Sequence, residues 1–208
     1  MELRKLYDAT DWYWDSLPYR FTYGRAYSCL AKRMMEDGRL KDSRTRCRIL
    51  DCGIGTGLFS AALARASHSP LQLFGVDLSS KMLARAARRL RREETLPRLM
   101  IGDVSLPPVR TASMDCVIAA LVLEHVPDPQ AAICELARVA APEAPVVLVA
   151  TRPHAPDRIF RIVYRYRHYR PEELRHWMSQ AGLTAVRSYN LCGIARLFAA
   201  AYIGARHS

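Results

Sequence analysis

The residues with the clearest chemical potential are one acid and three glycines at alternating positions: Asp51, Gly53, Gly55 and Gly57. They end an apolar run that begins at Arg48. A glycine has no Cβ, so the chain can turn sharply there and bring its backbone N–H groups against a ligand. The pattern predicts a strand that turns into a helix beneath a bound nucleotide-like cofactor. A purely structural strand-to-helix turn is the alternative.

Two other known types of glycine-rich nucleotide-binding loop fit the spacing of these glycines less well. A dinucleotide site needs Gly-x-Gly-x-x-Gly, and its third glycine would fall on Leu58 or Ser60, depending on the frame. A phosphate-binding P-loop ends in Gly-Lys-Ser/Thr, whereas Gly57 is followed by Leu58 and Phe59. Both phosphate-binding interpretations are therefore disfavoured.

The sequence from Arg48 to Gly57 resembles the first motif of the class I S-adenosylmethionine-dependent methyltransferases. The resemblance extends over about residues 7–206 and implies S-adenosylmethionine as the cofactor. It also implies a doubly wound, Rossmann-like α/β fold, with a mostly parallel seven-stranded sheet, helices on both faces and an antiparallel last strand. The cofactor contacts that it implies are Asp51, Gly53, Gly55, Gly57, Asp77, Leu78, Met82, Asp103, Val104, Ala119, Ala120 and Tyr13.

Asp77 ends a second apolar run, residues 71–77, as the family pattern requires. A carboxylate at this position can accept hydrogen bonds from both ribose hydroxyls. The alternative is that Asp77 caps the helix that follows. Ser79 and Ser80 can cap that helix equally well, which favours the ribose assignment.

Asp103 and Val104 end a third expected strand, residues 98–104. In the family, an aspartate here accepts a hydrogen bond from the adenine amine, and the next backbone N–H donates to the ring. A lone Gly-Asp pair at a strand end is otherwise a common turn.

Glu124 and His125 follow the fourth expected strand, residues 114–120, whose carbonyls at Ala119 and Ala120 would hold the methionine amino group. An imidazole with a pKa near neutrality can take a proton from an acceptor hydroxyl or amine. His125 is therefore the first candidate for a general base and Glu124 the second. The alternative is that His125 only packs against the next turn.

The remaining elements follow from periodicity and capping. Helices are expected over residues 79–92 and 129–140, and from Pro171 up to Gly182; strands are expected over residues 145–150, 183–189 and 198–205. Strands that alternate with helices predict a parallel sheet. We divide the chain into an N-terminal helical lid segment that shapes the acceptor site, residues 1–45, and a cofactor-binding core, residues 46–208, within one compact unit.

Composition narrows the class of protein. No apolar run approaches the ~20 residues that cross a bilayer, and no signal-peptide core follows the charged start, so we expect a cytoplasmic protein. No cysteine pair has Cys-x-x-Cys spacing, and most cysteines lie in apolar segments. We therefore expect reduced cysteines, with no metal site and no disulfide. The cysteines are at positions 29, 47, 52, 116, 134 and 192.

The net charge of +11 is unevenly distributed: residues 1–48 carry +4, residues 49–150 carry zero and residues 151–208 carry +7. The basic excess lies outside the cofactor half, which favours an anionic acceptor or an anionic surface that carries it. Residues 158–170 form a basic amphipathic stretch. This stretch is expected either to cover the active site or to contact an anionic membrane, which would make the protein membrane-associated. The fourth-strand motif lacks the Asn/Asp-Pro-Pro-Tyr of methylases that act on nucleic-acid amines, which argues against a nucleic-acid acceptor.

Aromatic residues concentrate at the N-terminus, where Tyr7, Tyr13 and Tyr23 are candidates to cover the cationic sulfur of the cofactor. The alternative is that these rings only fix a terminal helix to the core. Three functions remain open. The first is methyl transfer to a small aromatic or amphipathic metabolite. The second is a peripheral membrane methyltransferase that acts on a lipid head group or a prenylated quinone. The third is a cofactor-binding domain with no transferase activity or with a repurposed reaction.

Overall fold

The computed structural model describes residues 16–40, 46–155 and 167–207. Within these ranges, seven strands form one sheet in the order β3-β2-β1-β4-β5-β7-β6. All neighbouring strands from β3 to β5 are parallel, and β7 is antiparallel to both β5 and β6. The predicted fold, including the antiparallel last strand, is confirmed. The strands are β1 (Cys47–Cys52), β2 (Leu71–Asp77), β3 (Arg98–Ile101), β4 (Cys116–Ala120), β5 (Pro145–Thr151), β6 (Leu183–Asn190) and β7 (Ala199–Arg206).

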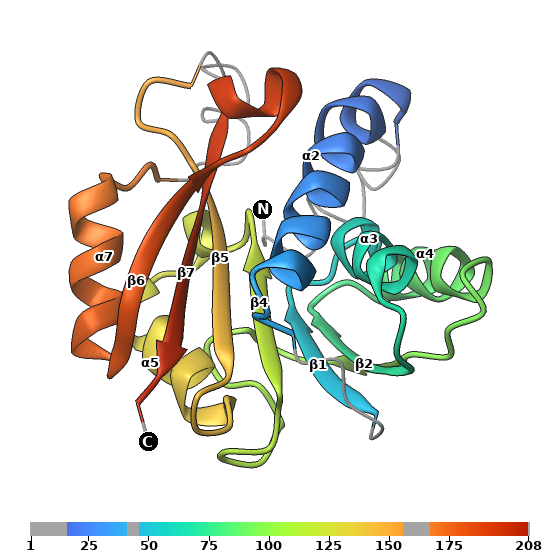
Figure 1. The fold of residues 1–208 in the computed structure, drawn as a ribbon, viewed down its shortest axis with the longest axis horizontal. Helices are drawn as coiled ribbons and strands as arrows, with labels where there is room; N and C mark the ends of the chain where they lie inside the picture. The colour runs from blue at the N-terminus through green and yellow to red at the C-terminus, as the bar shows by residue number, and fades with distance from the viewer. Residues whose placement is uncertain (1–15, 41–45, 156–166, 208) are drawn as a thin grey trace.

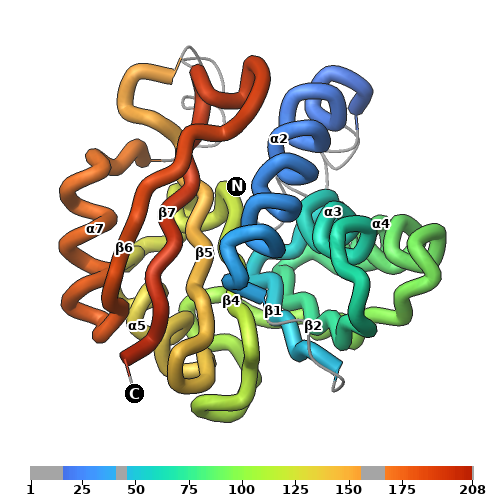
Figure 2. Tube along the Cα trace, viewed as in Figure 1, coloured from blue at the N-terminus to red at the C-terminus, as the bar shows by residue number. Residues whose placement is uncertain are grey.

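Helices cover both faces of the sheet (Figure 1). Those on one face are α2 (Leu17–Glu36), α3 (Leu58–Ala66) and α4 (Ser80–Arg91); those on the other are α5 (Pro129–Val139) and α7 (Pro171–Gln180). Two short 3-10 turns are η2 (Leu123–His125) and η3 (Gly193–Leu197). The tube in Figure 2 shows that α2 runs across the sheet next to α3.

The core consists of two hydrophobic clusters separated by the sheet. Strand β5 contributes to both: Val147 and Val149 pack on the α2–α3 side, and Val146 and Leu148 pack on the α5–α7 side. Because both faces are covered, this strand is apolar along its whole length, as is typical of a buried parallel sheet.

Two helices begin where their caps predict. The hydroxyl of Ser79 accepts a hydrogen bond from the backbone N–H of Met82 at 3.2 Å. The carboxylate of Asp128 accepts one from the backbone N–H of Ala131 at 3.0 Å, and Pro129 occupies the first helical position. These interactions satisfy N–H groups that a helix leaves unpaired in its first turn.

Two predicted strands are shorter than expected. Strand β3 ends at Ile101 instead of residue 104, because the carboxylate of Asp103 accepts a hydrogen bond from the Ser105 backbone N–H at 2.8 Å and turns the chain. Strand β4 begins at Cys116 instead of residue 114, since Met114 makes only an isolated bridge to Ala140.

The prediction that all cysteines are reduced is wrong for two of them. Cys29 of α2 and Cys192, just before η3, form a disulfide across 163 residues of sequence. Their spacing gave no sign of this pairing, because only the tertiary fold brings α2 next to η3. Cys47, Cys52 and Cys116 are free and buried, and Cys134 is free and exposed.

The predicted division into a lid segment and a core stays a prediction. Helix α2 packs in the same hydrophobic cluster as α3, through Ala26, Tyr27 and Leu30. Residues 158–166 of the basic stretch lie outside the described residues. Among the helices that the structure describes, none has the length and apolarity needed to cross a membrane.

Candidate active site

The loop between β1 and α3 has a backbone that only glycine adopts easily. Gly53 and Gly57 have φ angles of +73° and +74°. A Cβ on Gly53 would lie 2.6 Å from Val122 Cγ2, so this position has neither the conformation nor the space for a side chain. The backbone N–H of Gly53 donates to the Val76 carbonyl at 2.7 Å, which fixes the loop against the end of β2.

Asp77 connects this loop to the next helix. Its Oδ2 accepts a hydrogen bond from the Gly55 N–H, and its Oδ1 accepts one from the Ser79 N–H, both at 2.9 Å. Ser79, and not Asp77, is the N-cap of α4. Asp77 therefore joins the glycine loop to the start of α4 at the edge of the cavity.

Asp51 lies beneath the loop and is 2% exposed. The Ser60 hydroxyl donates a hydrogen bond to its Oδ2 at 2.7 Å. Burial raises the pKa of Asp51 to about 7, although the Ser60 hydrogen bond lowers it, and the nearby Asp77 charge raises it further. This carboxyl group therefore changes its charge close to neutral pH.

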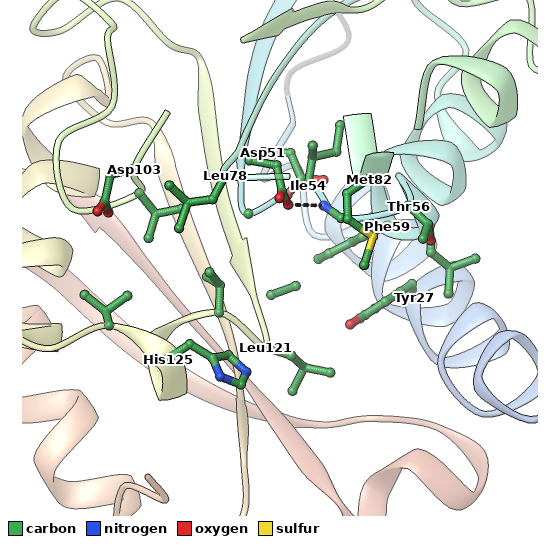
Figure 3. A pocket seen from close by; sticks show the side chains of 18 of the residues that line it. Tyr27, Asp51, Ile54, Thr56, Phe59, Leu78, Met82, Asp103, Leu121 and His125 are labelled. Carbon is green, nitrogen blue, oxygen red and sulfur yellow. Dashed lines mark hydrogen bonds between the residues drawn. The ribbon is translucent and has the colours of Figure 1, made fainter. Parts of the chain in front are cut away.

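A cavity of about 380 Å³ opens at the carboxyl ends of the central strands. Three carboxylates line it, those of Asp51, Asp77 and Asp103, and no lysine or arginine is among the described residues around it. The surroundings favour a cation. Figure 3 shows His125 and Leu121 across the cavity from Asp51 and Ile54. The lining residues are Tyr19, Tyr27, Asp51, Gly53, Ile54, Gly55, Thr56, Leu58, Phe59, Asp77, Leu78, Met82, Asp103, Val104, Ala120, Leu121, Val122, His125, Val126 and Pro127.

Comparison with known proteins gives consistent results. A family model described as "Methyltransferase domain" matches residues 50–148. A demethylmenaquinone methyltransferase of Lactiplantibacillus plantarum is 26% identical over 162 residues, which cover 68% of this chain and 68% of that protein. A malonyl-[acyl-carrier protein] O-methyltransferase of Halorhodospira halophila is 35% identical over 128 residues, which cover 60% of this chain and 41% of that protein.

Among solved structures, magnesium protoporphyrin IX methyltransferase from Synechocystis with bound S-adenosylhomocysteine shares the fold. Its TM-score is 0.77 at 18% identity, and the match covers 98% of each chain. These matches and the shared fold support a class I S-adenosylmethionine-dependent methyltransferase.

The cavity brings together most of the site residues expected of this methyltransferase. Those that line it are Asp51, Gly53, Gly55, Asp77, Leu78, Met82, Asp103, Val104, Ala120 and His125. Gly57 does not line the cavity; a Cβ there would lie 3.2 Å from Ala86 Cα, so this glycine permits α3 and α4 to pack closely. Ala119 is buried in the core on the α5 side. Tyr13 lies outside the described residues.

The aromatic wall of the methyltransferase cavity differs from the prediction. Tyr7 lies outside the described residues, and Tyr23 packs between Tyr19 and Tyr27 without lining the cavity. Tyr19 and Tyr27 face the cavity instead, and the Tyr27 ring stacks on Phe59 with centroids 4.7 Å apart. The sequence showed an aromatic cluster here but not which rings of α2 face inward.

His125 lines the cavity, but its basicity differs from the expectation of a pKa near neutrality. Burial lowers the pKa of the imidazole to about 4. The side chain is therefore neutral at physiological pH. It can accept a hydrogen bond there but holds a transferred proton only weakly.

Glu124, the second candidate for a general base, is not among the residues that line the cavity. It is 3% exposed, and its Oε1 accepts a hydrogen bond from the Thr151 backbone N–H at 2.6 Å. Burial raises its pKa. In a 3-10 turn, successive side chains point about 120° apart, so Glu124 ties η2 to the end of β5 while His125 faces the cavity.

Several lining residues were missed, and two had a sequence signal. Ile54 and Thr56 stand between the loop glycines, where alternate residues must also meet the ligand space. Leu121 had no signal in the sequence. Its φ of +55° is uncommon for a branched residue, and its backbone N–H donates to the Val149 carbonyl at 2.7 Å. Such strain often occurs at functional sites.

Proposed function

We propose that this methyltransferase transfers the methyl group of S-adenosylmethionine to a small, uncharged acceptor with an aromatic or otherwise apolar body. The observation that carries the proposal is that two chemically different groups of residues line the cavity. One group is the glycine loop with three carboxylates; the other is a set of apolar and aromatic side chains with one neutral histidine.

The carboxylate part of the lining suits the cofactor, which supplies a methyl group already activated by a cationic sulfur. We assign the Asp77 carboxylate to the ribose hydroxyls, and Asp103 with the Val104 N–H to the adenine edge. We assign Asp51 to the ammonium group of the methionine part, whose positive charge a carboxylate can balance. A Cβ at Gly55 would meet only the Gly53 carbonyl, at 3.9 Å, so the loop leaves open space beside Asp77.

Three further parts of the cofactor assignment are proposals of the same kind. Leu78 and Met82 lie beside the adenosine site as apolar packing surfaces. The β4 carbonyls at Ala119 and Ala120 are assigned to the amino group of the methionine part. Tyr13 stays a predicted cover over the sulfur.

The apolar part of the lining suits an apolar acceptor. It includes Tyr27, Leu121, Val122, Val126 and the His125 imidazole. The absence of described basic side chains from the lining argues against a free anionic acceptor, because burying an unpaired anion is costly. The protein itself has to align the acceptor with the methyl group and exclude water, since displacement at an activated methyl needs little other catalysis.

A membrane-embedded acceptor is the second candidate function. It is supported by the exposed apolar side chains of η3, with Ile194 59% and Leu197 55% exposed next to Arg196. A surface with basic and large apolar side chains can lie at an anionic membrane. The demethylmenaquinone methyltransferase of L. plantarum is named for a quinone substrate, which is an apolar ring of this kind.

Transfer of a labelled methyl group from S-adenosylmethionine tests the proposal. The acceptors are an uncharged demethylated quinone, a malonyl thioester and phosphoethanolamine, with a parallel quinone reaction on phosphatidylglycerol vesicles. We expect transfer to the uncharged quinone ring, and vesicles increase the rate if the second candidate holds. Transfer only to phosphoethanolamine would contradict the apolar acceptor. Binding of the cofactor with no transfer to any acceptor would favour a non-transferase role.

A further inference from the structure

A second hollow of the molecule is a groove of about 440 Å³ between α2, α3 and α4. These three helices lie side by side on the same face of the sheet (Figure 1). Five arginines line the groove: Arg20, Arg25, Arg65, Arg89 and Arg92. The single acid among its lining residues is Glu93, which pairs with Arg65.

The α2 side of the groove is an apolar stripe. Leu17, Phe21, Gly24 and Ser28 line it at intervals of three and four residues, so they lie along one side of the helix. Leu17 is 66% and Phe21 is 78% exposed, which is unusual for two large apolar side chains one turn apart. Gly24 borders Leu58 of α3, since a Cβ on Gly24 would lie 3.8 Å from Leu58 Cδ1, so the exposed apolar surface of the groove is that of Leu17 and Phe21.

Three of the arginines are available for an anionic partner. In the described part of the chain, no hydrogen bond or ion pair engages the guanidinium groups of Arg20, Arg25 and Arg92. The other two have structural contacts: Arg65 pairs with Glu93, and Arg89 donates to the Thr56 carbonyl at 3.0 Å and to its hydroxyl at 2.8 Å. The groove therefore combines exposed apolar surface with uncompensated positive charge.

We propose that this groove is a docking site for an acidic amphipathic helix of a partner protein. The partner's apolar face packs on Leu17 and Phe21, and its acidic side chains pair with Arg20, Arg25 and Arg92. A helix laid in a groove with apolar anchors one turn apart is a common recognition mode. The paired charges also give the contact its orientation.

Charge and shape favour this occupant over the others. A second copy of this chain carries the same net charge of +11, so it would be repelled from a basic groove. A flat membrane surface cannot follow a concavity between three helices. A nucleic acid would pair with the arginines, but its phosphate backbone would make no apolar contact with Leu17 and Phe21.

The groove adjoins the active site. Leu58 lines both the groove and the cavity, and Arg89 of the groove binds Thr56, which lines the cavity. Helix α2 likewise contributes Tyr19 and Tyr27 to the cavity and Phe21 to the groove. A docked partner is thus separated from the cavity by one layer of residues. The proposed docking site does not depend on which acceptor molecule is methylated.

The test uses a synthetic peptide of about four helical turns, with leucine along one face and glutamate beside it, labelled for fluorescence anisotropy. Two control peptides have lysine in place of glutamate, or the same residues in scrambled order. We expect the full-length protein to bind the acidic amphipathic peptide and neither control. Arg20→Glu together with Arg92→Glu weakens binding by at least about tenfold, because two attractions become repulsions. Phe21→Ser weakens binding as well.

The matched control is Arg110→Glu together with Arg187→Glu, which removes the same charge at two exposed arginines outside the groove. This variant is expected to bind the peptide within about twofold of the unaltered protein, since distant charges are screened. Thermal unfolding and S-adenosylhomocysteine binding establish that both double variants fold. Failure to bind the acidic peptide, or equal loss in both double variants, would overturn the proposal. The proposal would also be overturned if the protein bound phosphatidylglycerol vesicles or single-stranded RNA instead of the peptide, and if Arg20→Glu together with Arg92→Glu abolished that binding.

Discussion

The backbone N–H of Gly55 donates a hydrogen bond to Oδ2 of Asp77 at 2.9 Å, across 22 residues of sequence. This contact joins the glycine loop after β1 to the end of β2. The carboxylate assigned to the cofactor ribose therefore also fixes the loop that would face the rest of the cofactor. The two parts of the site are held together before any ligand binds.

Alanine substitutions at two loop glycines should have different effects. Gly53→Ala places a Cβ 2.6 Å from Val122 Cγ2 at a positive φ, so we expect a loss of about 1–3 kcal/mol in the free energy of unfolding. Gly55→Ala meets open space, and its backbone strain alone should cost about 1 kcal/mol. Denaturant unfolding measures both.

The same two variants distinguish an effect on packing from an effect on ligand binding. Gly55→Ala should weaken S-adenosylhomocysteine binding more than it weakens the fold, because its methyl group enters the space of the ligand. If Gly55→Ala binds the ligand as well as the unaltered protein does, the Gly55 position does not face the cofactor.

The charge of Asp51 should make cofactor affinity depend on pH. Burial raises its pKa to about 7 in the unliganded protein, and the ammonium group of the ligand, to which Asp51 is assigned, favours the ionised form. The affinity therefore rises as pH increases through 7 and is lost as Asp51 takes up a proton at lower pH. We expect S-adenosylhomocysteine to bind up to about tenfold more weakly at pH 6 than at pH 8.

Asp51→Asn is the control for this prediction, because the amide keeps the shape but does not titrate. Its affinity should be lower than that of the unaltered protein at pH 8 and nearly constant over the same range. An equal pH dependence in both proteins would assign the titration to another group.

The sequence predicted what depends on local pattern. Caps and apolar periods were sufficient for an α/β domain, whereas the seven-stranded sheet and the roles of Asp51, Asp77 and Asp103 came from the resemblance to the methyltransferase family. The wrong predictions concern which side chains the tertiary fold brings together. Adjacent Glu124 and His125 could not be told apart, because a 3-10 turn sends them to opposite environments. The Cys29–Cys192 contact depends on where α2 crosses the molecule.

His125 should affect the rate without contributing a neutral-range pKa. Burial lowers its pKa to about 4, so the imidazole is already neutral across pH 6–8 and the rate should not change there through this group. His125→Ala should lower kcat by about tenfold at saturating acceptor, through loss of one hydrogen bond to the acceptor. An unchanged kcat would remove His125 from the chemistry. A rate that falls near pH 6.5 in the unaltered protein but not in the variant would mean that its pKa is not lowered.

The disulfide between Cys29 and Cys192 should stabilise the attachment of α2. A cross-link over 163 residues restricts the unfolded chain strongly. We expect reduction to lower Tm by about 5–15 °C, as measured by circular dichroism with and without a reductant. Cys192→Ser should show the lower Tm under both conditions.

The free and exposed Cys134 offers the matched control for this measurement. Cys134→Ser should retain the full difference between oxidised and reduced protein. If the oxidised and reduced forms of the unaltered protein unfold at the same temperature, the Cys29–Cys192 bond does not form in solution.

The central claim is that the cavity between the glycine loop, Asp77 and Asp103 binds S-adenosylmethionine. Isothermal titration calorimetry with S-adenosylhomocysteine tests it most directly, using the unaltered protein, Asp77→Ala and the exposed control Arg110→Glu. We expect one site per chain, unaffected by Arg110→Glu, and a loss of at least about tenfold in affinity for Asp77→Ala, since a charge-assisted hydrogen bond to the ribose is lost. No detectable binding of S-adenosylhomocysteine or S-adenosylmethionine to the folded, unaltered protein would contradict the account.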